Sequence, residues 1–285
     1  EHIHLWHALG IEDSPSASEY ADIFLFQLYP YASVHLGPEG MLGGEAQNRV
    51  AGFWRALGKN PPPEPDHLAA LLGLYATLSE QVRPEQKVSN ELSGFSEAEA
   101  VLITQGRDAL LQEHIAPWVP AYLERVIEIA SGPYRGWAVL LDKVLQVELV
   151  RVGHPERLPL HLRESPPLAD PQTDGADAFI SGLLAPVRAG IILTRADLAR
   201  LASELDLGLR VGERRYALEH LLGQDSSGFL QSLAVEAARQ ALGHEHRREL
   251  LGVTADFFRD RAWATSELLR KLSDGGAEIT AKIMS

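Results

Sequence analysis

Apolar residues recur along this chain at the spacing of amphipathic helices. Two segments place them at positions i, i+4, i+7 and i+11: Ala46, Val50, Phe53 and Leu57, then Leu111, Ile115, Trp118 and Tyr122. A third segment continues this rhythm through Trp137, Leu140, Leu141, Val144 and Leu145. Strand-like alternation is confined to short pieces such as ASVHLG and LGLRVG, which are too few to make a sheet. The pattern therefore predicts an all-α fold.

The residues that begin and end helices agree with this reading. Thr194 and Asp197 have the spacing of a capping box, and Gly208 is placed to end the helix that they begin. Pro117 and Pro120 cannot both lie inside one unbroken helix. We therefore expect one helix to end near His114 and another to begin around Pro117, or the two to join at a sharp kink.

A proline-rich stretch, residues 153–177, interrupts the helical pattern and reads as a linker. It lies close to a change in the balance of basic and acidic residues. Residues 1–185 carry 12 Lys and Arg and 25 Asp and Glu, whereas residues 186–285 carry 14 of each kind. We divide the chain into a helical core, residues 1–160, a linker, residues 161–176, and a helical extension, residues 177–285.

The composition narrows the class of protein. With 285 residues, 45% of them hydrophobic and 23% charged, the chain has the make-up of a soluble globular protein. It shows neither an apolar run of about 18 residues nor a basic, then apolar leader, so we expect a cytoplasmic protein without stable membrane insertion. The absence of cysteine excludes disulfides, thiol catalysis and cysteine metal sites.

The net charge of −13 bears on the partner. An acidic surface repels phosphate backbones and attracts basic partners, so a cationic peptide is a better candidate than nucleic acid. An acidic surface that only keeps the protein soluble is the alternative. We expect a monomer or a homodimer, because no residue distinguishes the two.

Asp66 and His67 stand out in the segment PPPEPDHLAALLGLYATL, residues 61–78. A hydrolase would need the carboxylate to orient the imidazole, yet neighbouring residues of a helix point apart, and no G-x-S-x-G elbow is present. Aspartate is a preferred N-cap, so we predict that Asp66 caps the helix that begins here. We expect no catalytic residue, although a hydrolase that depends on His67 stays a rival hypothesis.

Metal and phosphate sites have little support. Glu113 and His114 are sequence neighbours, as are Glu219 and His220, and none has the i, i+4 spacing that places two ligands on one helical face. The glycine-rich GPEGMLGGE lacks the spacing of a phosphate-binding loop and reads as a helix entry. We expect neither a metal nor a cofactor.

Residues 194–222 support an alternative of another class. Two short helices with a glycine-containing turn resemble a helix-turn-helix DNA-binding regulator, and Arg210, Arg214 and Arg215 would contact phosphates. The neutral extension and the acidic chain argue for ordinary helical packing instead.

Trp118 and Tyr122 follow the break that Pro117 and Pro120 make. Aromatic residues at helical spacing usually belong to the core. At such a break, however, a groove between helices could accept the apolar part of a peptide. We interpret both residues as candidates for that groove.

Three segments together resemble the TorD, DmsD and NarJ family of molybdoenzyme maturation chaperones. They are YPYASVHLGPEGMLGGEAQNRVAGFWRALG (29–58), EPDHLAALLGLYATL (64–78) and LLQEHIAPWVPAYLERV (110–126). The combination of P-D-H-L with a downstream E-H-x-x-P-W-x-P is the specific part, and the resemblance covers roughly residues 15–150.

The resemblance implies a helical bundle and a non-enzymatic function. Such a chaperone binds the twin-arginine signal peptide and the unfinished catalytic subunit of a molybdopterin oxidoreductase, assists cofactor insertion and delays export. The family's Asp-His motif carries over onto Asp66 and His67 as peptide-binding residues, and the E-H…W segment onto His114 and Trp118. Tyr122 joins them in the predicted groove. The extension goes beyond the shorter family core.

Overall fold

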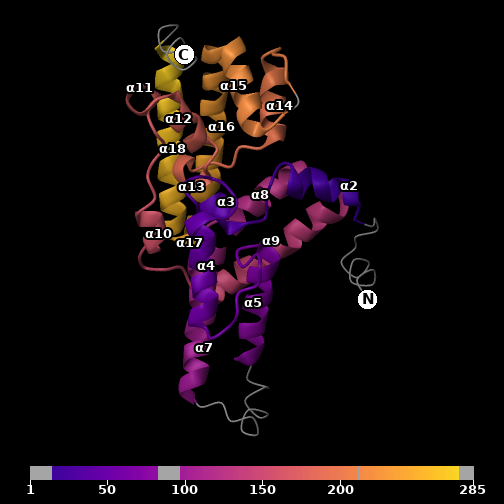
Figure 1. Ribbon diagram of the computed structural model, residues 1–285, viewed down its shortest axis with the longest axis vertical. Coiled ribbons are helices and arrows are strands. Elements are labelled where there is room, and N and C mark those ends of the chain that lie inside the picture. Colours follow the sequence, from indigo (N-terminus) through magenta and orange to yellow (C-terminus); the bar gives the residue numbers. More distant parts are fainter. Residues whose placement is uncertain (1–14, 83–96, 211, 276–285) are drawn as a thin grey trace.

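A computed structural model describes residues 15–82, 97–210 and 212–275 (Figure 1). Within these ranges the secondary structure is helical, and an isolated antiparallel bridge joins Tyr31 to His67. The predicted all-α fold is confirmed.

Helices of the N-terminal half form the lower and middle parts of the molecule in Figure 1. They are α2 (Ala17–Tyr20), the π-helix η1 (Ala21–Leu25), α3 (Ala32–Leu36), α4 (Gly44–Ala56), α5 (Leu68–Gln81), α7 (Glu97–Ala109), the π-helix η2 (Leu110–Ile115), α8 (Val119–Ile129) and α9 (Gly132–Val152). The helices α4, α5 and α7 extend downward, while α8 and α9 cross the middle.

Most of the later helices form the upper part of the molecule, while α10 (Leu160–Arg163) and α17 (Arg248–Leu251) lie at its middle. The others are α11 (Pro171–Asp174), α12 (Ala176–Leu183), α13 (Pro186–Ala189), α14 (Arg195–Glu204), α15 (Arg214–Gln224), α16 (Ser226–His246) and α18 (Val253–Asp274). The two longest, α16 and α18, pack as an antiparallel hairpin, because Ser227 bonds to Ser273 near one end and the His244 ring lies 5.6 Å from that of Phe258 near the other.

Two hydrophobic clusters hold the described helices together. The first is centred on α5, η2, α8 and α9, and the second on α12, α14, α15, α16 and α18. The clusters do not separate at the predicted linker, because Val187, Ile192 and Phe258 of the extension pack in the first. The linker itself contains α10 and α11. The division into core, linker and extension stays a prediction.

The structure tests the predicted helix ends. Thr194 and Asp197 form the capping box of α14, as predicted. The prediction for Gly208 is wrong, because α14 ends at Glu204 and the chain reverses at Asp206, which adopts a positive φ of 55°. The prediction of two helices around the proline pair is confirmed: η2 ends at Ile115 and α8 begins at Val119.

Ion pairs fasten the extension to α8. The buried Arg125 donates to both carboxylate oxygens of Asp197 on α14, at 2.5 and 2.6 Å, and lies 3.8 Å from the buried Glu236 on α16. Arg239 on α16 donates to Glu128 on α8 at 2.7 Å. The first turn of α14 therefore has two functions, since Asp197 both caps its own helix and binds α8.

Candidate functional site

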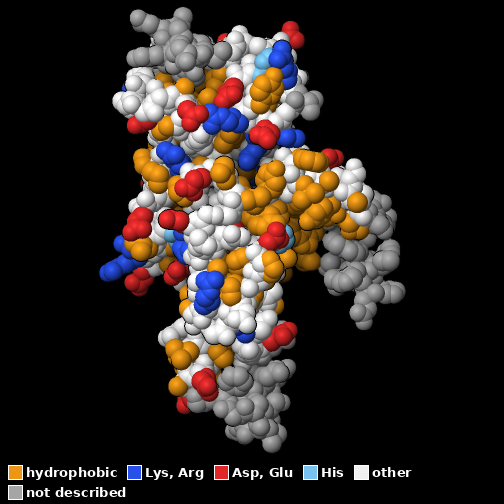
Figure 2. Space-filling view, in the orientation of Figure 1, with side chains coloured by type: hydrophobic (Ala, Val, Ile, Leu, Met, Phe, Trp, Pro, Cys, Tyr) orange, Lys and Arg blue, Asp and Glu red, His pale blue; other side chains and the backbone are white. Residues whose placement is uncertain are grey.

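An apolar groove of about 290 Å³ opens beside His67, and we call it the aromatic groove. Its lining comes from α2, η1, α5, the start of α9 and the segments before α3 and α5: Tyr20, Phe24, Pro30, His67, Leu68, Ala69, Leu72, Tyr134 and Trp137. Figure 2 shows a broad hydrophobic surface over this part of the molecule. A concave apolar surface with a few polar groups at its edge is the usual form of a ligand or peptide site.

Four aromatic rings build one wall of the aromatic groove. The ring of Phe24 lies 5.2 Å from that of Tyr20, 5.4 Å from that of Tyr134 and 5.8 Å from that of Trp137. The last two contacts are edge-to-face, a favourable geometry for aromatic pairs. Phe24 is buried, whereas Tyr20 leaves 41% of its surface exposed. The wall therefore has a fixed centre and an accessible edge.

His67 supplies a polar group to the aromatic groove. It is the N-cap of α5, and its Nδ1 accepts a hydrogen bond from the backbone N–H of Ala69 at 3.1 Å. An accepting Nδ1 places the proton of the neutral ring on Nε2, which leaves an N–H donor. The ring also stands edge-to-face against Tyr31 at 4.8 Å. A backbone carbonyl of a bound peptide is a suitable acceptor for that N–H.

Asp66 does not cap α5, so that prediction is wrong. Its Oδ2 instead accepts the backbone N–H of Ser33 at 3.0 Å, in the first turn of α3. Backbone bonds from Ala32 to Asp66 and from Leu68 to Pro30 reinforce the same junction. The side chain is fully buried, and its Oδ1 has no hydrogen-bond partner among the described residues. Asp66 thus fixes the turn that presents His67.

Carboxylates border the groove. Glu64 is exposed and lies beside Tyr31, and burial together with the negative charges of Glu64 and Asp66 raises the pKa of Tyr31 to about 12. On the other side, Glu19 accepts hydrogen bonds from Ser131. Within the part of the chain that the structure describes, no ion pair involves Glu19 or Glu64. Both charges are therefore open to a cationic partner.

The other predicted residues lie beneath the surface. His114, Trp118 and Tyr122 are at most 2% exposed, so the prediction that Trp118 and Tyr122 line an open groove fails in this conformation. The indole N–H of Trp118 bonds to the carbonyl of His114 at 2.8 Å, and the Tyr122 hydroxyl donates to the carbonyl of Leu28 at 3.2 Å. Their part in peptide binding stays a prediction, and direct contact would need the core to open.

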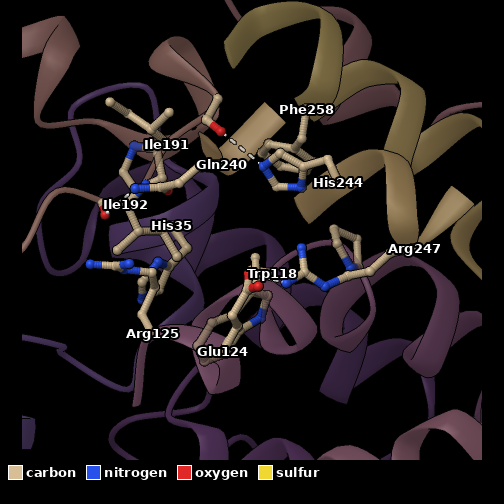
Figure 3. Close-up of a pocket in the computed structure, with 14 residues that line it drawn as sticks. His35, Trp118, Glu124, Arg125, Ile191, Ile192, Gln240, His244, Arg247 and Phe258 are labelled. Carbon is tan, nitrogen blue, oxygen red and sulfur yellow. Dashed lines mark hydrogen bonds and ion pairs between the residues drawn. The ribbon is translucent and has the colours of Figure 1, made fainter. Parts of the chain in front are cut away.

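Trp118 lines a small cavity between α8 and the extension, not the aromatic groove (Figure 3). Its ring stacks on that of His35, with centroids 4.8 Å apart. From the extension, His244 and Phe258 complete the lining, and the His244 Nε2 bonds to the carbonyl of Gly190 at 2.9 Å. The space is about 20 Å³, room for one water molecule, so it cannot hold a peptide.

Burial suppresses the charge of the histidines in and near this junction. Burial lowers the pKa of His35 to about 4, and burial with the nearby Arg49 lowers that of His114 to about 4. Burial and Arg247 lower the pKa of His244 to about 4. All three rings are neutral at physiological pH, so they contribute packing and hydrogen bonds in place of charge.

The described residues offer neither a metal centre nor a free cluster of the arginines predicted to contact phosphates. Among the described residues, no three His, Cys, Asp or Glu side chains form a group that could hold a metal ion. The predicted phosphate contacts are engaged internally, because Arg214 donates to the carbonyl of Leu193, Arg215 pairs with Glu219, and Arg210 bonds to Tyr216. No helix in the described ranges is long and apolar enough to cross a membrane.

Known proteins are similar to the N-terminal part of this chain. Residues 12–124 match the family model described as nitrate reductase delta subunit. The chaperone protein TorD of Vibrio vulnificus strain YJ016 is 30% identical over 135 residues, and that of strain CMCP6 is 29% identical over 135 residues. The N-terminal part of this chain is thus similar to the family of nitrate reductase delta subunits and to the TorD chaperones. We call residues 12–124 the TorD-like region.

The similarity has a limited extent. Each alignment takes in 44% of this chain and 58% of the relative, so the chain spans little more than half the length of the curated relatives that it matches. No solved structure matches the chain significantly. Of the aromatic groove, η1 and the start of α5 lie in the TorD-like region, whereas Tyr134 and Trp137 follow it.

Sequence reasoning found His67 but missed the rings beside it. Tyr20 and Phe24 are four residues apart, and Tyr134 and Trp137 three apart, which is the spacing of neighbours on one helical face. This spacing predicts that the two rings of each pair are neighbours. It does not reveal that the two distant pairs contact each other, since that contact depends on how η1 packs on α9.

Proposed function

We propose that this chain is a maturation chaperone whose aromatic groove binds the twin-arginine leader of an unfinished molybdopterin oxidoreductase subunit. The similarity of the TorD-like region to the TorD chaperones supports the chaperone class. Such a protein holds its client until the cofactor is inserted and export can begin. Because this step precedes export, it belongs in the cytoplasm and requires no catalytic residue.

The chemistry of the aromatic groove is the observation that carries the proposal. A leader of this class combines guanidinium groups with an apolar stretch, so its receptor needs carboxylates beside a hydrophobic surface. Glu19 and Glu64 offer the carboxylates, and the rings of Tyr20, Tyr134 and Trp137 offer the apolar surface.

The five residues predicted from the sequence have different roles in this proposal. His67 contacts the peptide directly, and the buried Asp66 holds the turn that presents it. Tyr122 fixes the segment before Pro30 through its bond to Leu28. His114 and Trp118 support α3 and η2 from beneath, as positioning residues.

Calorimetry with a synthetic leader tests the proposal. The peptide carries two adjacent arginines followed by 13 apolar residues. We expect Leu72→Glu to weaken binding at least tenfold, because a carboxylate would be desolvated in the apolar groove. His67→Asn should weaken it by about threefold to tenfold, since asparagine keeps the N-cap but lacks the imidazole. Tyr216→Ala, a half-exposed aromatic position on α15, is the matched control and should bind normally.

Two results would contradict the proposal. Absence of binding by the wild-type chain would remove the function. Unchanged binding by Leu72→Glu would remove the aromatic groove as its site. A peptide with glutamines in place of its arginines tests the carboxylates separately, and it should bind more weakly than the leader and with less dependence on salt.

A further inference from the structure

A ridge of exposed apolar side chains runs along α9 away from the aromatic groove. Leu140, Val144 and Val147 are 37%, 49% and 68% exposed. With Trp137 they occupy positions i, i+3, i+7 and i+10 of one helix, which is one helical face. We call Leu140, Val144 and Val147 the α9 ridge, and it begins one turn beyond the tryptophan that lines the groove.

The fold of the chain does not account for these apolar residues. Another face of α9 already packs in the first hydrophobic cluster through Ala138, Leu145 and Leu149, which are nearly or fully buried. A helix that needs one apolar stripe for its own packing can carry polar residues elsewhere. A second, contiguous apolar stripe in water is typical of a surface that binds a partner.

Charge differs between the two ends of this surface. Glu19 and Glu64 border the aromatic groove without ion pairs among the described residues. Along the α9 ridge stands the exposed Lys143, and at its far end the half-exposed Arg151 donates to Glu148 at 2.5 Å and to the Tyr75 hydroxyl at 2.9 Å. A cationic segment is thus attracted to the aromatic groove. The paired charges at the far end of the α9 ridge give it no net electrostatic attraction.

We propose that the α9 ridge binds the apolar stretch of the leader, with the arginines held at Glu19 and Glu64 and the chain running toward Val147. This inference rests on the proposed function and adds the direction in which the bound leader lies on the protein. From Tyr134 to Val147 the helix advances 13 residues, or about 20 Å at 1.5 Å per residue. A helical apolar segment of about 13 residues has the same length and can lie along this face.

Paired changes in protein and peptide test the ridge. The double variant Val144→Gln with Val147→Gln changes exposed positions without altering charge, so folding should persist. We expect it to bind the leader of two arginines and 13 apolar residues about tenfold more weakly than wild type. It should bind a short leader, with only four apolar residues after the arginines, as tightly as wild type does. Val235→Gln with Leu242→Gln, at exposed positions of α16, is the matched control.

Photo-crosslinking tests the direction. A photoreactive leucine at the end of the apolar stretch should attach to residues 140–150, and one beside the arginines should attach near residues 19–31 or 64–69. The reverse pattern would overturn the proposed direction. Equal binding of the long leader by wild type and the double glutamine variant, with Leu72→Glu still defective, would remove the ridge and leave the proposed function standing. Absence of leader binding by wild type would remove both.

Discussion

Three buried histidines should make this protein unstable in mild acid. His35, His114 and His244 are at most 7% exposed, and the pKa of each is lowered to about 4 in the folded chain. An unfolded histidine has a pKa near 6.5, so between pH 6.5 and 4 the unfolded chain binds more protons than the folded one. Stability is therefore fully present above pH 6.5 and is lost as the pH falls toward 4.

The size of the effect follows from the same values. Between pH 7.5 and 5.5 each histidine should lower the free energy of unfolding by about 1.3 kcal/mol, and the three together by about 4 kcal/mol. Domains of this kind have a stability of roughly 5–15 kcal/mol, so the loss is a large share of the total. The buried Nδ1 atoms of His35 and His114 have no partner among the described residues, so a proton there would create an unpaired buried charge.

Urea unfolding followed by tryptophan fluorescence, at several pH values from 7.5 to 5.5, measures this loss. His35→Gln and His244→Gln provide the matched variants, because the amide can keep donating to the carbonyl of Tyr29 or Gly190 without titrating. Together they should remove the part of the loss that His35 and His244 contribute, about 2.6 kcal/mol between pH 7.5 and 5.5. A stability that stays constant over this range, or an unaltered pH dependence in the double variant, would refute the reasoning.

Two further predictions concern the extension, the first its attachment to α8 and the second its internal packing. Arg125→Met should lower the free energy of unfolding by about 3 kcal/mol, since the buried Asp197 loses its short ion pair and keeps only Arg200, 3.9 Å away. Arg125→Met with Asp197→Asn should lower it less, because the amide oxygen can keep the cap without a buried charge. Urea titration distinguishes these outcomes, and equal losses would contradict them. Gly190→Ala should lower the melting temperature, because φ is +74° and a Cβ would lie 2.3 Å from the backbone N of Ala262. Gly52→Ala, with open space inside α4, is its control and should leave the melting temperature unchanged or raise it.

The periodicity of apolar residues predicted most of the helices, because the apolar faces of these helices are buried against one another. The apolar positions Ala46 and Val50 lie on the buried face of α4, as the pattern requires. The two π-helices were not predicted, since one extra residue in a turn leaves the apolar spacing almost unchanged. The piece ASVHLG resembled a strand and forms α3, where every residue is buried and alternation therefore carries no information.

The candidate site was predictable only in part. The sequence indicated Asp66 and His67 as a polar pair but assigned the cap to the wrong member, because Asp66 bonds to Ser33, 33 residues away. Trp118 was expected in a groove because a proline break precedes it. The extension covers that face of α8 instead, and no local pattern predicts which distant helix packs there.

The burial of the junction around Trp118 has a consequence for cooperativity. The TorD-like region contributes His35 and Trp118 to the cavity of Figure 3, while the α16 and α18 hairpin contributes His244 and Phe258. Neither part completes this interior alone, so unfolding of the hairpin would expose His35 and Trp118 of the TorD-like region. A substitution in the extension can thus lower the population of chains in which the aromatic groove is formed, and with it the proposed binding of the leader.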